Sequence, residues 1–199
     1  MPRSSLPYQE AHDFVQKLAG RTDNDGRALW LVTYTGARYI EAAAACWKEF
    51  DLQRRIWTIP PDRMKKRHIH EIPLPRQVVA FLEALPGDHH PDDLVFPSRE
   101  GTPVANSRVN DVLRDLGYQI GEASTHGFRS TLRTWVGDTY KDIKKEIAES
   151  VIAHDKRSGV EQTCERTRFL KDRRPIMQAW ADYLDAPPPA DEDSFLAGA

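Results

Sequence analysis

The 199-residue sequence has little cysteine, no long apolar run and almost no surplus of either charge. Its two cysteines, Cys46 and Cys164, are too few for a disulfide framework, so we expect a protein that works in a reducing interior. No apolar run approaches the roughly 20 residues that a transmembrane helix needs, and no signal-peptide pattern opens the chain. We therefore expect neither a membrane partner nor a secreted scaffold.

The overall charge hides an uneven distribution. The chain carries 28 Lys+Arg against 30 Asp+Glu, a net charge of −2, whereas nucleic-acid-binding domains are usually basic. Residues 52–76, however, carry a net charge of +5, residues 156–174 carry +4 and residues 182–193 carry −5. DNA responds to local surface charge, so the two basic segments can form a DNA-binding face. The alternative is that they are ordinary solvated faces.

Hydrophobic spacing predicts a mostly α (α+β) fold with a small antiparallel β-hairpin. Helical patterns cover residues 7–18, 28–34, 38–47, 76–85, 105–117, 126–140, 142–153, 159–170 and 172–184. The β-type runs 56–59 and 68–72 are expected to pair, with a turn at Phe50 to Leu52 before them and Lys65 in the connecting loop.

We expect a single domain over residues 7–185. Residues 1–6 are predicted to be a disordered leader, and residues 86–103 are predicted to be mostly loop. Residues 186–199 contain a triple proline and several acids, which predicts a flexible acidic tail.

Two short stretches carry polar residues suited to anion binding. His126 and Arg129 stand three residues apart at the start of a predicted helix, where free N–H groups and the helix dipole favour negative charge. Arg38 stands at the mouth of another helix with Glu41 three residues later, so Glu41 could orient Arg38 toward a phosphate. The alternative for both stretches is an ordinary surface arginine.

Two further residues have an equally open interpretation. Lys65 could reach from the hairpin loop into a cleft, and His154 follows an apolar stretch where a core or capping histidine is also common. A metal-dependent hydrolase built on His68, His70 and either His126 or His154 is a third reading, but the spacing fits metal binding poorly. We predict no metal and no other cofactor.

The order of several motifs is more specific than any one of them. The chain resembles the catalytic domain of tyrosine recombinases, or phage integrases, of the prophage and genomic-island type, over about residues 6–185. The motifs that carry the resemblance are Thr35-Gly36-Ala37-Arg38-Tyr39-Ile40-Glu41, Trp57-Thr58-Ile59-Pro60, Arg63-Met64-Lys65, His70-Glu71-Ile72-Pro73-Leu74, Val95-Phe96-Pro97-Ser98, Thr125-His126-Gly127-Phe128-Arg129-Ser130, Ala153-His154 and Arg173-Arg174-Pro175-Ile176-Met177-Gln178-Ala179-Trp180-Ala181-Asp182-Tyr183.

The resemblance implies a chemistry and a set of roles. Members of the family break and rejoin DNA through a covalent 3′-phosphoprotein intermediate, without a metal. The resemblance assigns the scissile phosphate to Arg38, His126, Arg129 and His154. It assigns Lys65 as the proton donor to the departing 5′ oxygen. Forked guanidinium groups suit the charge that develops on the two non-bridging oxygens.

The chain departs from the family at the nucleophile. The family's tyrosine follows the second histidine by about ten residues, and here Cys164 aligns with that place; Tyr140 and Tyr183 are not natural substitutes. Cysteine is shorter, and a misplacement of about 1 Å can cost around 100-fold in rate. Three explanations stay open: an engineered replacement, a natural lesion in a decaying or repurposed integrase, and a true thiol nucleophile.

The resemblance also implies partners and a location. We expect double-stranded DNA, a homo-oligomer on DNA, a monomer or weak oligomer without it, and a cytoplasmic protein of bacterial or phage origin. Integrases of this type carry amino-terminal arm-binding and core-binding domains, so the chain is expected to be a fragment or truncated product. The alternative function is a catalytically silent DNA-binding or regulatory remnant of an integrase.

Overall fold

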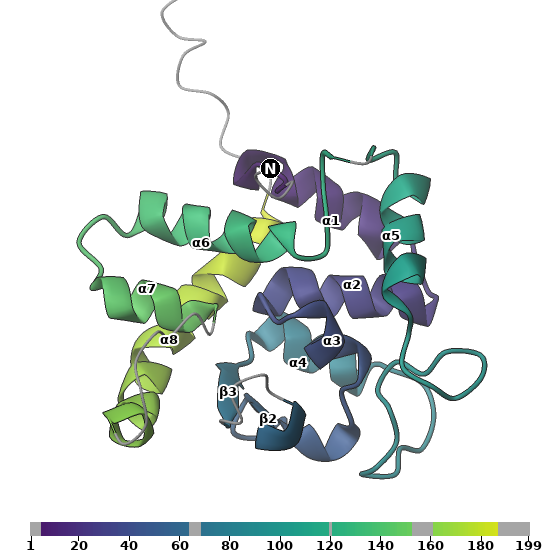
Figure 1. Cartoon of the computed structure of the whole chain (residues 1–199), viewed down its shortest axis with the longest axis horizontal. Helices are drawn as coiled ribbons and strands as arrows, with labels where there is room; N and C mark the ends of the chain where they lie inside the picture. Colours follow the sequence, from purple (N-terminus) through teal and green to yellow (C-terminus); the bar gives the residue numbers. More distant parts are fainter. Residues whose placement is uncertain (1–4, 64–68, 120, 153–160, 187–199) are drawn as a thin grey trace, which may run out of the picture.

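The chain folds mostly into helices, with a small sheet in the lower part of the view in Figure 1. The computed structural model describes residues 5–63, 69–119, 121–152 and 161–186, and for residues 161–168 it describes the backbone only. Short 3₁₀ turns cover Tyr8–Glu10, Trp47–Glu49 and Pro61–Arg63. The helices are α1 (Ala11–Ala19), α2 (Asn24–Thr35), α3 (Tyr39–Ala43), α4 (Arg76–Glu83), α5 (Asn106–Asp115), α6 (Gly127–Thr139), α7 (Lys145–Val151) and α8 (Glu161–Asp185).

The sheet has three strands where the sequence predicted two. Strands β1 (Phe50–Asp51), β2 (Ile56–Ile59) and β3 (His70–Pro73) are antiparallel in the order β1-β2-β3. The predicted pairing of the two longer strands is confirmed, but the turn predicted at Phe50 is wrong. A two-residue strand is too short to show alternation, and Phe50 is held by pairing with Trp57 and by stacking of the two rings at 5.1 Å.

Two helix predictions also need correction. The helix predicted over 38–47 ends at Ala43, because the Ala45 carbonyl accepts the Val95 N–H and Cys46 forms a β-bridge with Leu94. Tertiary pairing thus overrides the helix propensity of the alanine run. The separate helices predicted over 159–170 and 172–184 form the single helix α8, which continues through Lys171 and contains Pro175 within it.

Helix α8 is the central element of the fold. It packs against α1, α2, α7 and β3, and in Figure 1 it runs behind α6 and α7 into the middle of the molecule. Its last turns are tied to α2, since the Trp180 indole donates to the Thr33 carbonyl at 2.9 Å and the Tyr34 hydroxyl donates to Asp185. The helix therefore belongs to the core of its own chain.

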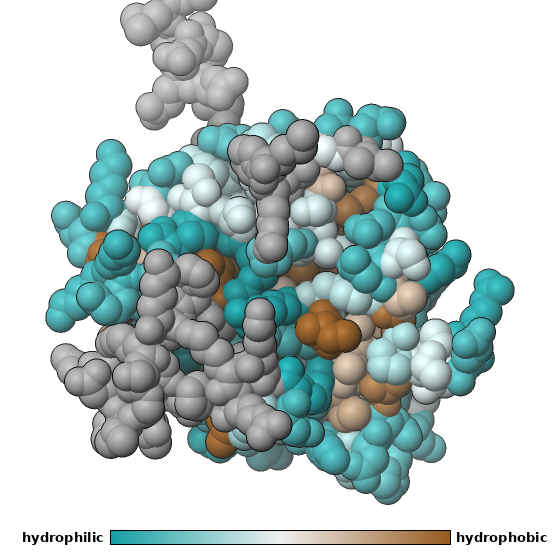
Figure 2. All heavy atoms as spheres, in the orientation of Figure 1, coloured by the Kyte–Doolittle hydropathy of each residue, from teal (hydrophilic) through white to brown (hydrophobic). Residues whose placement is uncertain are grey.

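The surface in Figure 2 is mostly hydrophilic, with small and separate hydrophobic areas. Most large apolar side chains of the described residues are buried in one cluster, to which Leu6 also belongs. The Leu6 carbonyl accepts the Thr131 hydroxyl at 2.6 Å, so this residue of the predicted leader packs on the domain. No helix in the described part of the chain combines the length and apolar composition that crossing a membrane requires.

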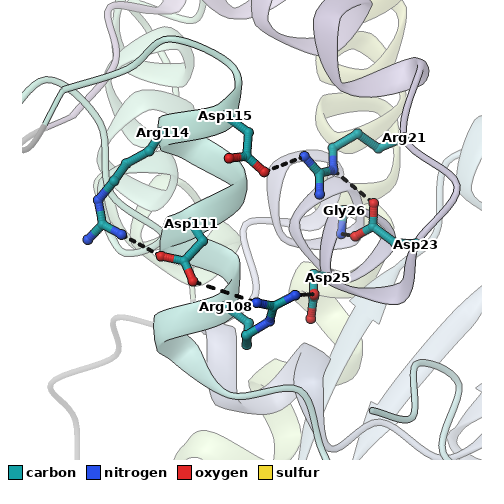
Figure 3. Close-up of polar contacts among 8 residues, drawn as sticks. All are labelled: Arg21, Asp23, Asp25, Gly26, Arg108, Asp111, Arg114 and Asp115. Atoms are coloured by element: carbon teal, nitrogen blue, oxygen red, sulfur yellow. Dashed lines mark hydrogen bonds and ion pairs between the residues drawn. The ribbon is translucent and has the colours of Figure 1, made fainter. Parts of the chain in front are cut away.

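A network of ion pairs joins α5 to the start of α2 (Figure 3). Arg21 bonds Asp23 and Asp115, each at 2.9 Å, and Asp23 also accepts the Gly26 N–H as the N-cap of α2. Arg108 and Arg114, both on α5, likewise pair with aspartates. Because the charges drawn in Figure 3 pair with one another, we interpret this cluster as a structural bracket and not as an anion site.

Candidate functional site

Arg38 lies where two helices meet. Helix α2 ends at Gly36, whose backbone has the left-handed φ of 63°, and Arg38 is the N-cap of α3. Glu41, only 2% exposed, accepts the Arg38 main-chain N–H and the Arg38 Nη1–H, both at 2.7 Å. Glu41 thus holds one arm of the Arg38 guanidinium, while the Arg38 side chain stays 35% exposed.

Arg129 is buried behind this position. It is 5% exposed, and its Nη1 and Nη2 atoms donate to the carbonyls of Gly36 and Ile152. The guanidinium thus joins α6 to the turn after α2 and to the end of α7. Gly36 precedes Arg38 by two residues, so Arg129 contacts the main chain next to Arg38.

The two arginines influence one another electrostatically. The pKa of Arg129 is lowered to about 10, mainly because the guanidinium is buried and also because Arg38 is positively charged. The negative charge of Glu41 acts in the opposite direction. Arg129 remains charged near neutral pH, so two positive charges act on one another at this corner of the fold, and an anion bound to both guanidinium groups would offset that repulsion.

Gly36 gives a direct test of how tightly this corner is built. A Cβ at Gly36 lies 2.6 Å from Leu132 Cδ2, whereas Gly101 has a similar φ of 73° and nothing within 4 Å of an added Cβ. We expect Gly101→Ala to cost about 1 kcal/mol of unfolding free energy from backbone strain alone, and Gly36→Ala about 2–3 kcal/mol from strain plus the clash. Urea denaturation of both variants measures the difference, and equal losses contradict it.

A second buried link was not predicted from the sequence. Glu49 is buried, accepts the Trp57 indole N–H at 2.9 Å and pairs with Arg63. Arg63 also donates to the Glu41 main-chain carbonyl. The start of the segment that joins β2 to β3 is therefore fastened to α3. The only sequence signal was the presence of Arg63 in a family motif two residues before Lys65.

The structure brings together part of the predicted residue set. Arg38, Glu41 and Arg129 form one cluster, and the exposed His126 is the N-cap of α6, three residues before Arg129. Lys65 and His154 lie outside the described residues. Cys164 is the fourth residue of α8, but its side chain also lies outside the described part. The roles predicted for these residues stay predictions.

No metal site is formed by the residues that the structure describes. Within them, no group of three or more His, Cys, Asp or Glu side chains is arranged to hold a metal ion. Two of the histidines considered for a metal-dependent hydrolase, His68 and His154, lie outside the described ranges. The described cluster offers guanidinium groups, which bind anions.

Sequence comparison relates the chain to integrases. The family model described as the phage integrase family matches residues 8–160. Prophage integrase IntA of Escherichia coli (strain K12) is 34% identical over 171 residues, covering 84% of this chain and 40% of that protein. The integrase of Enterobacteria phage P4 is 32% identical over 204 residues, covering 91% of this chain and 45% of that protein. The chain spans less than half the length of these curated relatives.

Solved structures share the fold at low sequence identity. The integrase from mycobacterium phage Brujita superposes with a TM-score of 0.66 at 19% identity, covering 99% of this chain and 63% of that one. The Tn1549 transposon integrase, solved in complex with transposon right end DNA, gives a TM-score of 0.59 at 14% identity, covering 87% and 66%. The mostly helical fold with a small antiparallel sheet is therefore that of integrase catalytic domains.

Proposed function

The chain belongs to the phage integrase family, and from this premise we propose that it acts in site-specific DNA recombination or integration. The observation that carries the proposal is the cluster of Arg38, Glu41 and Arg129, in which one buried and one half-exposed guanidinium lie close enough for their charges to interact. Such a pair suits the two non-bridging oxygens of a phosphodiester.

The proposed roles follow the expected chemistry. Arg38 and Arg129 bind the scissile phosphate together with His126 and His154, and Glu41 orients Arg38. The nucleophile at the position of Cys164 attacks phosphorus as a thiolate, its proton having passed to solvent, and bonds to the 3′-phosphate while the bond to the 5′ oxygen breaks. Lys65 gives its proton to the departing 5′ oxygen, which contributes roughly 10²–10⁴ in rate. Rejoining reverses these steps.

The proposed partner is double-stranded DNA, bound through one face of the domain. The basic segment over residues 52–76 begins at the sheet, and Arg63 within it is fastened to α3 beside the arginine cluster. The DNA complex of the Tn1549 transposon integrase supports this choice of partner. We expect a homo-oligomer on DNA, a monomer or weak oligomer without it, and a cytoplasmic location.

The second candidate function is a silent DNA-binding or regulatory module. What favours it is the predicted alignment of Cys164 with the family's tyrosine, since the sequence has cysteine at position 164. In such a module the phosphate cluster still binds DNA, but no strand is cut. The two candidates differ in one measurable property, the covalent bond between protein and DNA.

Three chains tested on one substrate distinguish these functions. The parent, Cys164→Ala and Cys164→Tyr are each incubated with labelled, nicked duplexes that carry a randomised core, and covalent adducts are resolved on a denaturing gel. We expect the Cys164→Tyr chain to form about 100-fold more adduct than the parent, because tyrosine restores the reach of the nucleophile. This result means that the pocket is intact and only the nucleophile is missing.

The other outcomes are equally decisive. Adduct from the parent chain that disappears in Cys164→Ala supports an active thiol nucleophile. No adduct from any of the three chains, with the duplexes still retained at low salt, contradicts recombination by this chain and supports the silent module.

A further inference from the structure

Arg173, on α8, is a second deeply buried arginine that the proposed chemistry leaves without a role. It is only 4% exposed, and burial lowers its pKa to about 10, with Glu71 acting in the opposite direction. Removing a guanidinium from water costs several kcal/mol unless its N–H groups find strong partners. A leucine or methionine fills a similar volume without this desolvation cost, so a buried charge at this position calls for an explanation.

The partners of Arg173 identify that reason. Its Nη1–H donates to the Ser150 carbonyl at 3.2 Å, and its Nε–H donates to the Phe169 carbonyl of its own helix at 3.4 Å. Ser150 lies in the last turn of α7, where carbonyls lack the usual N–H partner four residues later and carry the negative end of the helix dipole. Arg173 therefore caps α7 from a neighbouring helix.

The end of α7 is also held by Arg129. The Ile152 carbonyl, two residues after Ser150, accepts the Arg129 Nη2–H, and the Ile152 N–H itself bonds back to the Ser150 carbonyl. The chain of contacts runs from Arg173 to Ser150, then to Ile152 and then to Arg129. These links join α8, α7 and α6 through a single turn of seven-residue α7.

We propose that Arg173 is a positioning residue for Arg129: it fixes the last turn of α7, and the Ile152 carbonyl of that turn holds one arm of the Arg129 guanidinium. The other arm is held by Gly36, so the plane of the Arg129 fork is set from two sides. The contact of Arg129 with DNA rests on the proposed function. The positioning of Arg129 by Arg173 concerns the protein alone.

Arg174 is a matched control on the same helix. It is the next residue along α8, carries the same charge and donates to the Arg54 carbonyl at 2.9 Å on an exposed part of the surface. Arg173→Met and Arg174→Met each remove one positive charge from adjacent positions, but only the first removes the cap on α7. Arg173→Lys keeps the charge and one donor for Ser150, so we expect it to restore part of the effect.

The first experiment observes Arg129 directly, without DNA. In the ¹⁵N-labelled chain, the side-chain signals of Arg129 are assigned by their loss in Arg129→Lys. We expect Arg173→Met to shift these signals and speed their hydrogen exchange, Arg173→Lys to do so less, and Arg174→Met to leave them unchanged. Unchanged Arg129 signals in a folded Arg173→Met chain overturn the proposal, because a merely structural arginine affects stability and not this one side chain. If Arg173→Met does not fold, Arg129 signals in Arg173→Lys that shift no more than those in Arg174→Met, while Arg173→Lys loses the same stability as Arg173→Met, overturn it.

The second experiment measures binding of a short duplex at several salt concentrations in a double-mutant cycle. We expect Arg129→Lys to weaken binding about tenfold and Arg173→Met about threefold. The double variant should bind no more weakly than Arg129→Lys alone, since Arg173 acts through Arg129. Fully additive losses contradict the proposal. An Arg129→Lys variant that binds DNA normally contradicts the proposed phosphate contact, while the signals of the first experiment still decide the role of Arg173.

Discussion

Replacing Arg129 by lysine in the Cys164→Tyr chain is expected to lower covalent adduct formation by about 10²–10³-fold, the usual effect of removing one preorganised donor to a developing oxyanion. Lysine keeps the positive charge, but it has one compact head in place of a planar fork. The Arg129 guanidinium donates to the carbonyls of Gly36 and Ile152. A lysine ammonium cannot reach both carbonyls and the proposed phosphate at the same time. The initial rate of adduct formation on the nicked duplex measures the effect.

Arg133→Lys is the matched control for this prediction. Arg133 lies on the same helix, pairs with Glu149 of α7 at 2.9 Å and so also joins α6 to α7, but it does not contact Gly36. We expect less than a threefold change in the adduct rate, because exposed and half-exposed ion pairs contribute little. If both variants lose the same factor, Arg129 acts only as a helix connector and its catalytic role is contradicted.

Replacing Trp180 by alanine is expected to lower the unfolding free energy by about 3–5 kcal/mol. The side chain is fully buried, its ring lies 5.2 Å from that of Trp135, and its indole N–H donates to the Thr33 carbonyl at 2.9 Å. Alanine leaves a cavity at the junction of α8, α2 and α6 that rigid helices cannot close. Urea denaturation followed by circular dichroism measures the loss.

Trp180→Phe separates the hydrogen bond from the volume. Phenylalanine keeps an aromatic ring next to Trp135 but leaves the Thr33 carbonyl without its indole donor, so we expect a loss of about 1–2 kcal/mol. A Trp180→Ala variant as stable as Trp180→Phe contradicts a core position for α8. It favours a helix that can leave its own chain.

Much of the fold was readable from local patterns. The helices from α4 to α7 follow apolar residues at helical spacing, and the pairing of β2 with β3 follows alternation in two short runs. The two-residue strand β1 escaped detection because a run of that length has no period. The continuity of α8 also escaped, since charged residues such as Lys171 and Asp172 interrupt its apolar pattern without breaking a helix.

The candidate site divides in a similar way. The sequence by itself determined the family and the link from Arg38 to Glu41 three residues later, because motifs and i, i+3 spacing are local. The roles of Arg38 and Arg129 at a phosphate stay predictions. The sequence also shows that the net charge of −2 says little about a DNA partner, since it averages basic and acidic segments.

Only the tertiary structure decided how the arginines are used. Arg129 is buried and binds a carbonyl 93 residues away at Gly36, and Arg173 binds one 23 residues away at Ser150. Contacts from a side chain to a distant main-chain carbonyl depend on where the helices pack and not on which residue supplies the carbonyl. They leave no spacing or residue preference in the sequence, so only the folded structure reveals that two buried arginines hold the end of α7.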